Sequence, residues 1–278
     1  MAKWDSLIRF NAAEGGQYWA SLPLDTVPAA GLAVQGFSSI DELESDSLSG
    51  TRVTVEKLLA PVPDPTIAIM CIGLNYRNHA NEASLPIPAQ PPTWYKPAAS
   101  LADPETAIPI PVQAQNNFPD FEGELTIILR NSIKNISPAE APSHILGYTI
   151  GNDLTARVFQ RACGGQYTYA KGFDNFAPLG PRLVHPSLVS ADANGRIITR
   201  VNGKVVQDSH FDFIFGVDEI VSFVSQGTTV PAGTAIMTGT PAGVGWFQNP
   251  KCSLKDGDEI EVEVQPIGIL INSVYFEK

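Results

Sequence analysis

Three acidic residues have the types and spacing of a binding site for a divalent cation. Glu122 and Glu124 lie two apart in a segment that continues into the apolar run 126–129, and Asp153 ends a second apolar segment about thirty residues later. Because side chains alternate between the faces of a strand, Glu122 and Glu124 are expected on one face, roughly 7 Å apart along the backbone. Two carboxylates that close repel each other unless a cation lies between them. Three carboxylates without a thiolate favour a hard ion, so we predict Mg²⁺ or Mn²⁺ rather than Zn²⁺.

The alternative is an exposed acidic strand face, which is the commoner origin of a single Glu-x-Glu pattern. Glu122 and Glu124 interrupt an otherwise apolar segment, where solvated charges are out of place. The sequence therefore favours the metal site.

A histidine and a glutamate could supply a general base. His79 and Glu82 follow the apolar run 67–72, and in a helix side chains three residues apart are neighbours. Glu82 would hold one imidazole nitrogen, and the other would be free to take a proton from water. A structural histidine is the alternative, but a polar segment beside a strand end favours a chemical role.

Further polar residues follow Asp153. Arg157 and Gln160 come four and seven residues later, and a helical turn would place both on the side of Asp153, with a cation and an amide for a bound anion. Lys171 begins the segment 171–181, whose glycines and prolines predict an irregular loop. The default interpretation of Lys171 is a surface position.

The glycine-rich segment 238–245 lacks the Gly-Lys-Ser/Thr ending of a phosphate loop and the spacing of a dinucleotide fingerprint. Its amides and the hydroxyl of Thr240 could still bind a carboxylate. The chain has no Gly-x-Ser-x-Gly elbow, so a serine hydrolase is not expected.

The elements that must position these residues are mostly strands. The dipeptides Asn202-Gly203 and Asp256-Gly257 predict turns, the first a tight hairpin and the second the start of a further strand pair. Ser39 is expected to cap a short helix, and 217–224 has one apolar face typical of a helix. We predict a fold that is mostly β with some α (α+β). The proline-rich connector 61–65 divides it into a small N-terminal α+β domain, 1–65, and a catalytic domain, 66–278.

Composition limits the partners. The chain has 278 residues, of which 44% are hydrophobic and 17% charged, as expected for a well-buried globular protein. A net charge of −11 argues against nucleic acid or an anionic membrane as partner. Three widely spaced cysteines fit a reducing compartment, and neither a signal peptide nor a membrane-spanning segment is expected. We therefore predict a cytoplasmic protein.

Together these segments resemble the fumarylacetoacetate hydrolase (FAH) superfamily, in particular its short FAH-domain members. The resemblance runs from about residue 67 to 274 and is carried by Gly-Leu-Asn-Tyr at 73–76 with His79 and Glu82, Phe-Glu-Gly-Glu-Leu at 121–125, Gly-Asn-Asp-Leu-Thr-Ala-Arg at 151–157, and the segments 171–181 and 238–245. It implies a mixed β-sandwich roll, usually a homodimer. One departure is Val158, where related sequences often carry an acid, and this leaves the orientation of Arg157 open.

The resemblance also implies roles for individual residues. Mg²⁺ or Mn²⁺ would be held by Glu122, Glu124 and Asp153. The catalytic residues would be His79 and Glu82 on a lid that orders with substrate, Gln160 orienting water or the oxyanion, and Lys171 stabilising enolate charge. The substrate would be bound by Arg157, Thr240, Gly239 and Tyr76.

The implied substrate is a small 2-oxo acid or 1,3-dicarbonyl compound. Our leading hypothesis from sequence is a metal-dependent hydrolase that cleaves the C–C bond of acylpyruvate-like 2,4-dioxo acids through an enolate. The same site would serve an oxaloacetate tautomerase or decarboxylase, or an isomerase of 2-oxo acids. An enzyme tailoring a specialised metabolite and a catalytically silent binding protein are further alternatives, the latter disfavoured because every expected site residue is present.

Overall fold

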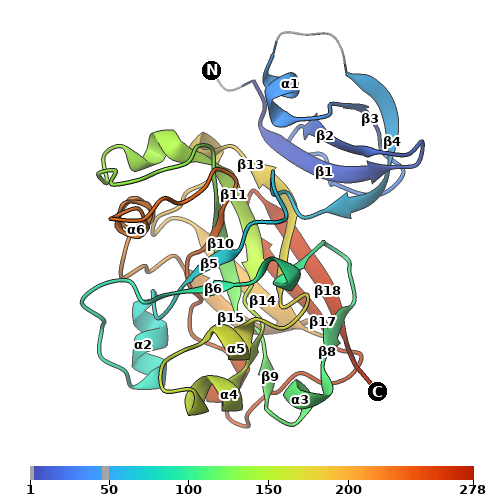
Figure 1. The fold of residues 1–278 in the computed structure, drawn as a ribbon. Helices are drawn as coiled ribbons and strands as arrows, with labels where there is room; N and C mark the ends of the chain where they lie inside the picture. The colour runs from blue at the N-terminus through green and yellow to red at the C-terminus, as the bar shows by residue number, and fades with distance from the viewer. Residues whose placement is uncertain (1–2, 46–49) are drawn as a thin grey trace.

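One large mixed sheet runs through the computed structural model (Figure 1), which describes residues 3–45 and 50–278. Met1 and Ala2, the start of the segment examined for a signal peptide, lie outside these ranges. The strand order is β3-β4-β1-β13-β11-β10-β16-β5-β6, with β2 beside β1 and β7 beside β13. The strands are β1 (Ser6–Ala12), β2 (Gln17–Leu22), β3 (Ala33–Gly36), β4 (Thr51–Leu59), β5 (Ile69–Ile72), β6 (Thr93–Lys96), β7 (Leu101–Ala102), β10 (Gly123–Leu129), β11 (Ile145–Asn152), β13 (Ala177–Val184) and β16 (Ala235–Met237).

A second sheet has the order β15-β14-β17-β18-β8, and a short pair joins β12 to β9. Apolar side chains of both larger sheets meet in one core, among them Ile127 and Ile150 from the first and Ile197 and Val262 from the second. The strands are β8 (Ile108–Ile110), β9 (Pro119–Asp120), β12 (Thr155–Ala156), β14 (Arg196–Val201), β15 (Lys204–His210), β17 (Glu259–Val264) and β18 (Gly268–Phe276). The predicted fold class, mostly β with some α, is confirmed.

The helices are short. Ser39 accepts a hydrogen bond from the amide of Glu42 and caps α1, and α6 buries Ile220 and Val221 on one face, both as predicted. No helix within 3–45 and 50–278 is long and apolar enough to cross a bilayer. The helices are α1 (Ile40–Glu44), α2 (Arg77–Ala83), α3 (Val112–Gln115), α4 (Arg157–Ala162), α5 (Thr168–Lys171) and α6 (Val217–Val224).

The local turn signals are confirmed. Asn202 and Gly203 both have positive φ, 50° and 74°, and close the hairpin in which Val201 pairs with Lys204. This is the backbone that a two-residue Asn-Gly turn requires. Gly257 lies just before the paired strands β17 and β18.

The expected irregular loop 171–181 is partly wrong, because residues from Ala177 onward belong to β13. Strand β11 pairs with Leu179, Gly180 and Val184 of β13. Neither Pro178 nor Pro181 therefore has to donate a hydrogen bond to β11, which is how a strand accommodates proline.

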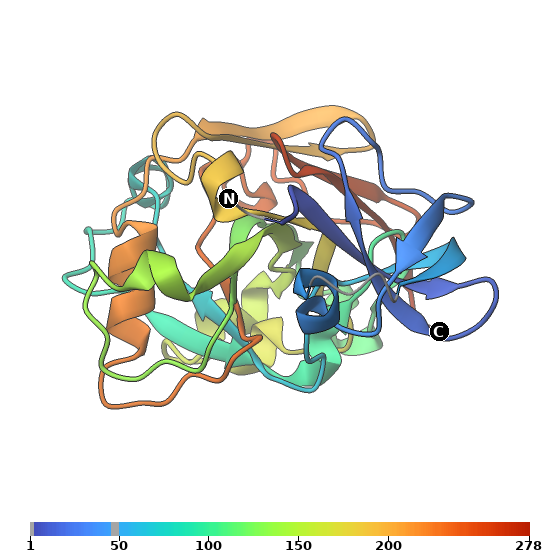
Figure 2. The same ribbon diagram turned by 90° about the horizontal axis from the view of Figure 1, so that it is seen from above.

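The N-terminal strands continue the large sheet. Strand β1 pairs with β13 through Ser6 opposite Val184 and Leu7 opposite Leu183. Figure 2 shows these strands, in blue, on one side of the main body and α6 on the opposite side. The domain division at residue 65 stays a prediction, since strand pairing crosses it.

Candidate active site

Glu122, Glu124 and Asp153 converge where β10 and β11 meet. Each is buried and offers a carboxylate oxygen, and these oxygens lie within 4.8 Å of one another. Glu124 is opposite Gly151 in the antiparallel pair, and the amide of Asp153 donates to the carbonyl of Glu122 at 2.9 Å. Glu122 directly precedes β10 rather than lying inside it. The expected convergence of the three side chains is thus what the fold produces.

Two buried lysines neutralise part of this cluster. Lys171 donates to Glu122 at 3.0 Å, to Asp153 at 2.6 Å and to the hydroxyl of Thr155 at 2.9 Å. Lys96 lies 2.5 Å from the other oxygen of Asp153. The default surface position for Lys171 is wrong, because its side chain is only 1% exposed and all three of its protons have acceptors.

Arg157 forms the opposite wall of the cluster. Its Nε donates to Asp120 at 2.7 Å, and its Nη1 donates to both Glu122 and the amide oxygen of Gln160. Its Nη2 is buried and has no partner among the described residues. A buried guanidinium nitrogen without an acceptor is costly, so it is a natural donor for a bound anion.

The prediction that a helical turn joins Asp153 to Arg157 is wrong. Strand β12 lies between them, and α4 begins only at Arg157. The i,i+3 contact that exists joins Arg157 to Gln160, at 3.0 Å.

The carboxylates of the cluster differ in proton affinity. Burial alone would raise the pKa of Glu122, but Lys171 and Arg157 outweigh it and hold that pKa at about 2. Burial, together with Asp153 and Glu122, raises the pKa of Glu124 well above its usual value. Glu122 is therefore ionised, and Glu124 is the carboxyl that lacks a compensating cation.

The donor set fits a hard divalent cation. Glu124 Oε1 is buried without a hydrogen-bond partner among the described residues, while Oε2 accepts from the amide of Gly239 at 2.6 Å. The three residues supply oxygen ligands only, as Mg²⁺ and Mn²⁺ prefer. A cation bound there would give Glu124 the counter-charge that the protein does not supply.

His79 and Glu82 form the expected pair on α2. Nδ1 of His79 lies 3.0 Å from Oε2 of Glu82, and their side chains are 12% and 20% exposed. The other oxygen of Glu82 accepts from the amide of Gly243 at 2.9 Å. The imidazole and the ring of Phe247 are in a T-shaped arrangement, with ring centroids 5.9 Å apart.

The glycine-rich loop 238–245 binds carboxylates of the protein itself. The amide of Gly239 holds Glu124 and that of Gly243 holds Glu82. Thr240 donates to the carbonyl of Gly123 at 2.9 Å, so its hydroxyl proton is already used. The loop therefore links the acidic cluster to the histidine pair.

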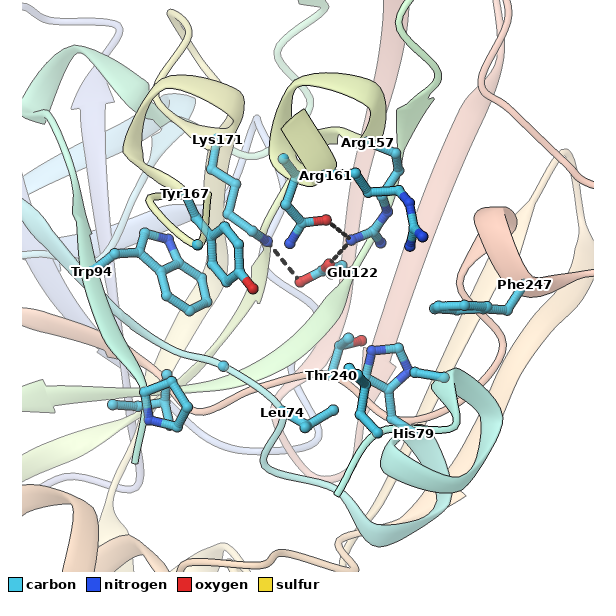
Figure 3. A pocket seen from close by; sticks show the side chains of 17 residues that line it. Leu74, His79, Trp94, Glu122, Arg157, Arg161, Tyr167, Lys171, Thr240 and Phe247 are labelled. Carbon is cyan, nitrogen blue, oxygen red and sulfur yellow. Dashed lines mark hydrogen bonds and ion pairs between the residues drawn. The ribbon is translucent and has the colours of Figure 1, made fainter. Parts of the chain in front are cut away.

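Six of the candidate residues line one cavity of about 420 Å³. Figure 3 shows His79 and Phe247 on one side, facing Glu122, Arg157 and Lys171 across the space. The candidate residues on its wall are His79, Glu122, Arg157, Gln160, Lys171 and Thr240.

Tyr76 and Gly239 do not line this cavity. Tyr76 is fully buried and packs edge-on against Phe213, 4.9 Å between ring centroids. Their assignment to substrate binding stays a prediction.

Sequence reasoning missed Lys96 and Asp120. Asp120 begins the same acidic segment as Glu122, and its position in an apolar context was a usable signal. Lys96 ends β6, whose only local pattern is aromatic, and nothing in that pattern indicates an ion pair with Asp153.

Comparisons with known proteins agree on one family. Residues 68–275 match the family model described as fumarylacetoacetate (FAA) hydrolase C-terminal. A mitochondrial oxaloacetate tautomerase from Homo sapiens is 38% identical over 218 residues, which cover 78% of this chain and 68% of that protein. The crystal structure of 2-hydroxyhepta-2,4-diene-1,7-dioate isomerase from Mycobacterium marinum is 32% identical, with a TM-score of 0.80 over 98% of this chain and 99% of that one. Fumarylacetoacetate hydrolase from psychrophilic Exiguobacterium antarcticum is 29% identical, with a TM-score of 0.81 over 98% and 100%.

Proposed function

Because this chain belongs to the fumarylacetoacetate hydrolase family, we propose that it is an enzyme that enolises small 2-oxo acids, with keto–enol tautomerisation of oxaloacetate as its reaction. The observation that carries the proposal is the cavity itself. His79, whose Nδ1 lies against Glu82, lines one side, and Arg157, whose Nη2 has no partner among the described residues, lines the other. This is the arrangement needed to move a proton on a bound anion.

His79 is the proposed acid–base residue. With Glu82 accepting from Nδ1–H, Nε2 is left unprotonated and takes a proton from the carbon next to the 2-oxo group. The C–H electron pair becomes the C=C bond, the carbonyl π pair moves to oxygen, and the imidazolium returns its proton to that oxygen. Atoms and charge balance without a co-reactant.

Arg157 and Gln160 are the proposed anchors for the substrate. Nη2 of Arg157 would bind the carboxylate next to the oxo group, and the amide N–H groups of Gln160 would donate to its oxygens, since Gln160 already accepts from Arg157 through its own oxygen. Lys171 acts as a positioning residue, because its three donors are committed to Glu122, Asp153 and Thr155.

Glu122, Glu124 and Asp153 would hold Mg²⁺ or Mn²⁺. When bound there, the ion would supply Lewis-acid polarisation of the 2-oxo group. Which of the two ions the protein uses stays a prediction, as do the cytoplasmic location and the homodimer. The human relative is named as a mitochondrial protein.

Hydrolysis of a C–C bond in acylpyruvates is the second candidate. It is favoured by the same pair, since His79 on an open cavity could equally activate water for attack on a distal carbonyl. The structural likeness to a fumarylacetoacetate hydrolase supports keeping it.

One NMR experiment separates these reactions. The Mg²⁺-loaded protein is mixed with oxaloacetate and, separately, with acetylpyruvate, and the His79→Ala variant serves as the control. We expect faster keto–enol exchange of oxaloacetate without new products. Acetate and pyruvate from acetylpyruvate would instead establish hydrolysis, and pyruvate from oxaloacetate would establish decarboxylation. If the wild-type protein accelerates neither reaction, the proposed function is wrong, and equal rates with His79→Ala would reject the role of His79.

A further inference from the structure

A second arginine lines the same cavity and has no assigned task. Arg161 lies on α4, four residues after Arg157, and its side chain is exposed. Within residues 3–45 and 50–278 it makes no ion pair with a carboxylate, whereas the three buried cations of the site each have one. We propose that Arg161 recognises the second carboxylate of a dicarboxylic 2-oxo acid. The inference rests on the proposed function, because it takes Arg157 as the anchor of the first carboxylate.

Helix geometry places Arg157 and Arg161 at neighbouring positions on one helix face. Residues four apart on a helix are neighbours, with Cβ atoms about 5–6 Å apart, and both Arg157 and Arg161 line the cavity. Two arginines from neighbouring helix positions on the wall of one cavity suit a short diacid whose carboxylates are joined by a two- or three-carbon chain. Arginine is suited to this task, because its planar fork binds a carboxylate through two parallel hydrogen bonds.

Trp246 is the aromatic residue that Arg161 contacts. The guanidinium of Arg161 is 5.4 Å from the centre of the Trp246 ring, within the range of a cation–π contact. Phe118 packs edge-on against the same ring at 5.0 Å. The indole thus restrains an otherwise exposed side chain at the edge of the cavity.

Asp120 ties Trp246 to the inner anchor. One oxygen of Asp120 accepts from the amide of Trp246 at 3.0 Å and from Nε of Arg157 at 2.7 Å. Its other oxygen accepts from the amide of Gly245 at 2.8 Å. One buried carboxylate therefore binds Arg157 directly and holds the backbone of Trp246, the residue whose ring Arg161 contacts.

Charge distinguishes Arg161 from an ordinary surface residue. Lys96, Lys171 and Arg157 are compensated by Asp153, Glu122 and Asp120. In a chain of net charge −11, an uncompensated arginine on the wall of the cavity raises the local concentration of anions.

The test compares a diacid with its monoester, which lacks only the distal carboxylate charge. The kinetic parameters kcat and KM are measured for oxaloacetate and for its 4-methyl ester, which lacks the distal charge. The proteins compared are wild type, Arg161→Met and Arg161→Lys. Arg52→Met is the control, since Arg52 is exposed on β4 and away from the cavity. We expect Arg161→Met to lower kcat/KM for oxaloacetate about 10- to 100-fold, mostly through KM, and to leave the ester within about twofold. Arg161→Lys should retain an intermediate preference, and Arg52→Met should resemble wild type.

Equal losses for both substrates, or no loss for either, would overturn the role of Arg161. If wild type turns over neither substrate, the proposed function has failed, and the inference is then decided by binding. Calorimetry with malate and with its 4-methyl ester gives the same comparison without turnover. A preference for malate that Arg161→Met abolishes supports the inference, and equal affinities in wild type reject it.

Discussion

Substitution of His79 should reduce catalysis without affecting metal binding. It lies outside the acidic cluster, so His79→Ala should lower kcat for oxaloacetate about 10²- to 10⁴-fold, the usual contribution of a positioned base, and leave Mg²⁺ affinity nearly unchanged. Turnover by NMR and Mg²⁺ titration by calorimetry measure the two effects.

Glu82→Gln is the matched variant, because it keeps the size of the side chain and weakens only the partner of Nδ1. We expect its kcat to lie between those of wild type and His79→Ala. A loss of Mg²⁺ binding in His79→Ala would show that the role assigned to this histidine is wrong.

Glu124 should make the metal-free protein less stable as pH rises. Its pKa in the folded protein is raised by burial, by Asp153 and by Glu122, above an unfolded value of about 4.3. Folding therefore takes up a proton between the two pKa values, and stability is full below the unfolded pKa and decreases as pH rises through that interval. Glutamine carries no charge at any pH, so Glu124→Gln removes this dependence.

Thermal unfolding in the presence of a chelator measures this pH dependence of stability. The Tm of Glu124→Gln should equal that of wild type near pH 4 and exceed it by a few degrees at pH 8. Added Mg²⁺ should raise the Tm of wild type and leave that of Glu124→Gln unchanged, because only the first binds the ion in the folded state. A variant that is less stable at both pH values would contradict the raised pKa.

At the scale of elements, the loop 238–245 connects the acidic cluster to the His79–Glu82 pair, and Gly243 is a position in it that cannot accept a side chain without a shift. Its φ is +107°, and a Cβ there would lie 2.1 Å from the carbonyl oxygen of Val206. Gly243→Ala must displace the amide that holds Glu82, so we expect kcat to fall at least tenfold.

Gly233→Ala is the matched control for Gly243→Ala. Gly233 also has positive φ, +81°, but a Cβ there meets only ordinary contacts at 3.6 Å or more. Both alanines carry the strain of a left-handed backbone, and only one moves Glu82. Equal effects of the two variants on kcat would show that backbone strain, rather than the position of Glu82, limits activity.

What the sequence predicts depends on how local the cause is. The Asn202-Gly203 turn, the cap at Ser39 and the contact of His79 with Glu82 each arise within a few residues, and all are in the structure. Lys96 was missed because its partner Asp153 is 57 residues away and reaches it only through the sheet.

Strand β13 was missed for a related reason. Its prolines predict an irregular segment. In the register that β13 adopts with β11, neither Pro178 nor Pro181 has to donate a hydrogen bond to β11. Arg157 shows the same limit, since the sequence identified the residue and the spacing argument gave the wrong neighbour. Pairing between strands far apart in the chain determines the structure of β13 and the neighbours of Arg157, and a single sequence does not reveal that pairing.

At the scale of the whole molecule, the N-terminal strands and the main body share one sheet and one hydrophobic cluster. Trp4, Leu7 and Trp19 pack in a cluster that also contains Leu146 and Leu183. Arg182, 5% exposed, donates to the carbonyls of Leu24 and Thr26 in the N-terminal segment and of Ile267 in the main body. The described residues of the N-terminal segment therefore support β13, which lies next to β11, the strand that leads into Asp153.

This connection predicts that residues 66–278 do not fold stably alone. Removing 1–65 would leave the β1-facing edge of β13 unpaired, expose Leu183, and take acceptors away from Arg182. An exposed apolar edge strand associates with other chains, so the shortened protein should aggregate on gel filtration. Co-expression of 1–65 with 66–278 is the control and should restore a soluble complex that binds Mg²⁺, because both halves of the sheet are again present. A soluble 66–278 fragment that binds Mg²⁺ with the affinity of the full chain would instead establish two independent domains, and would mean that the pairing of β1 with β13 adds little to the stability of the active site.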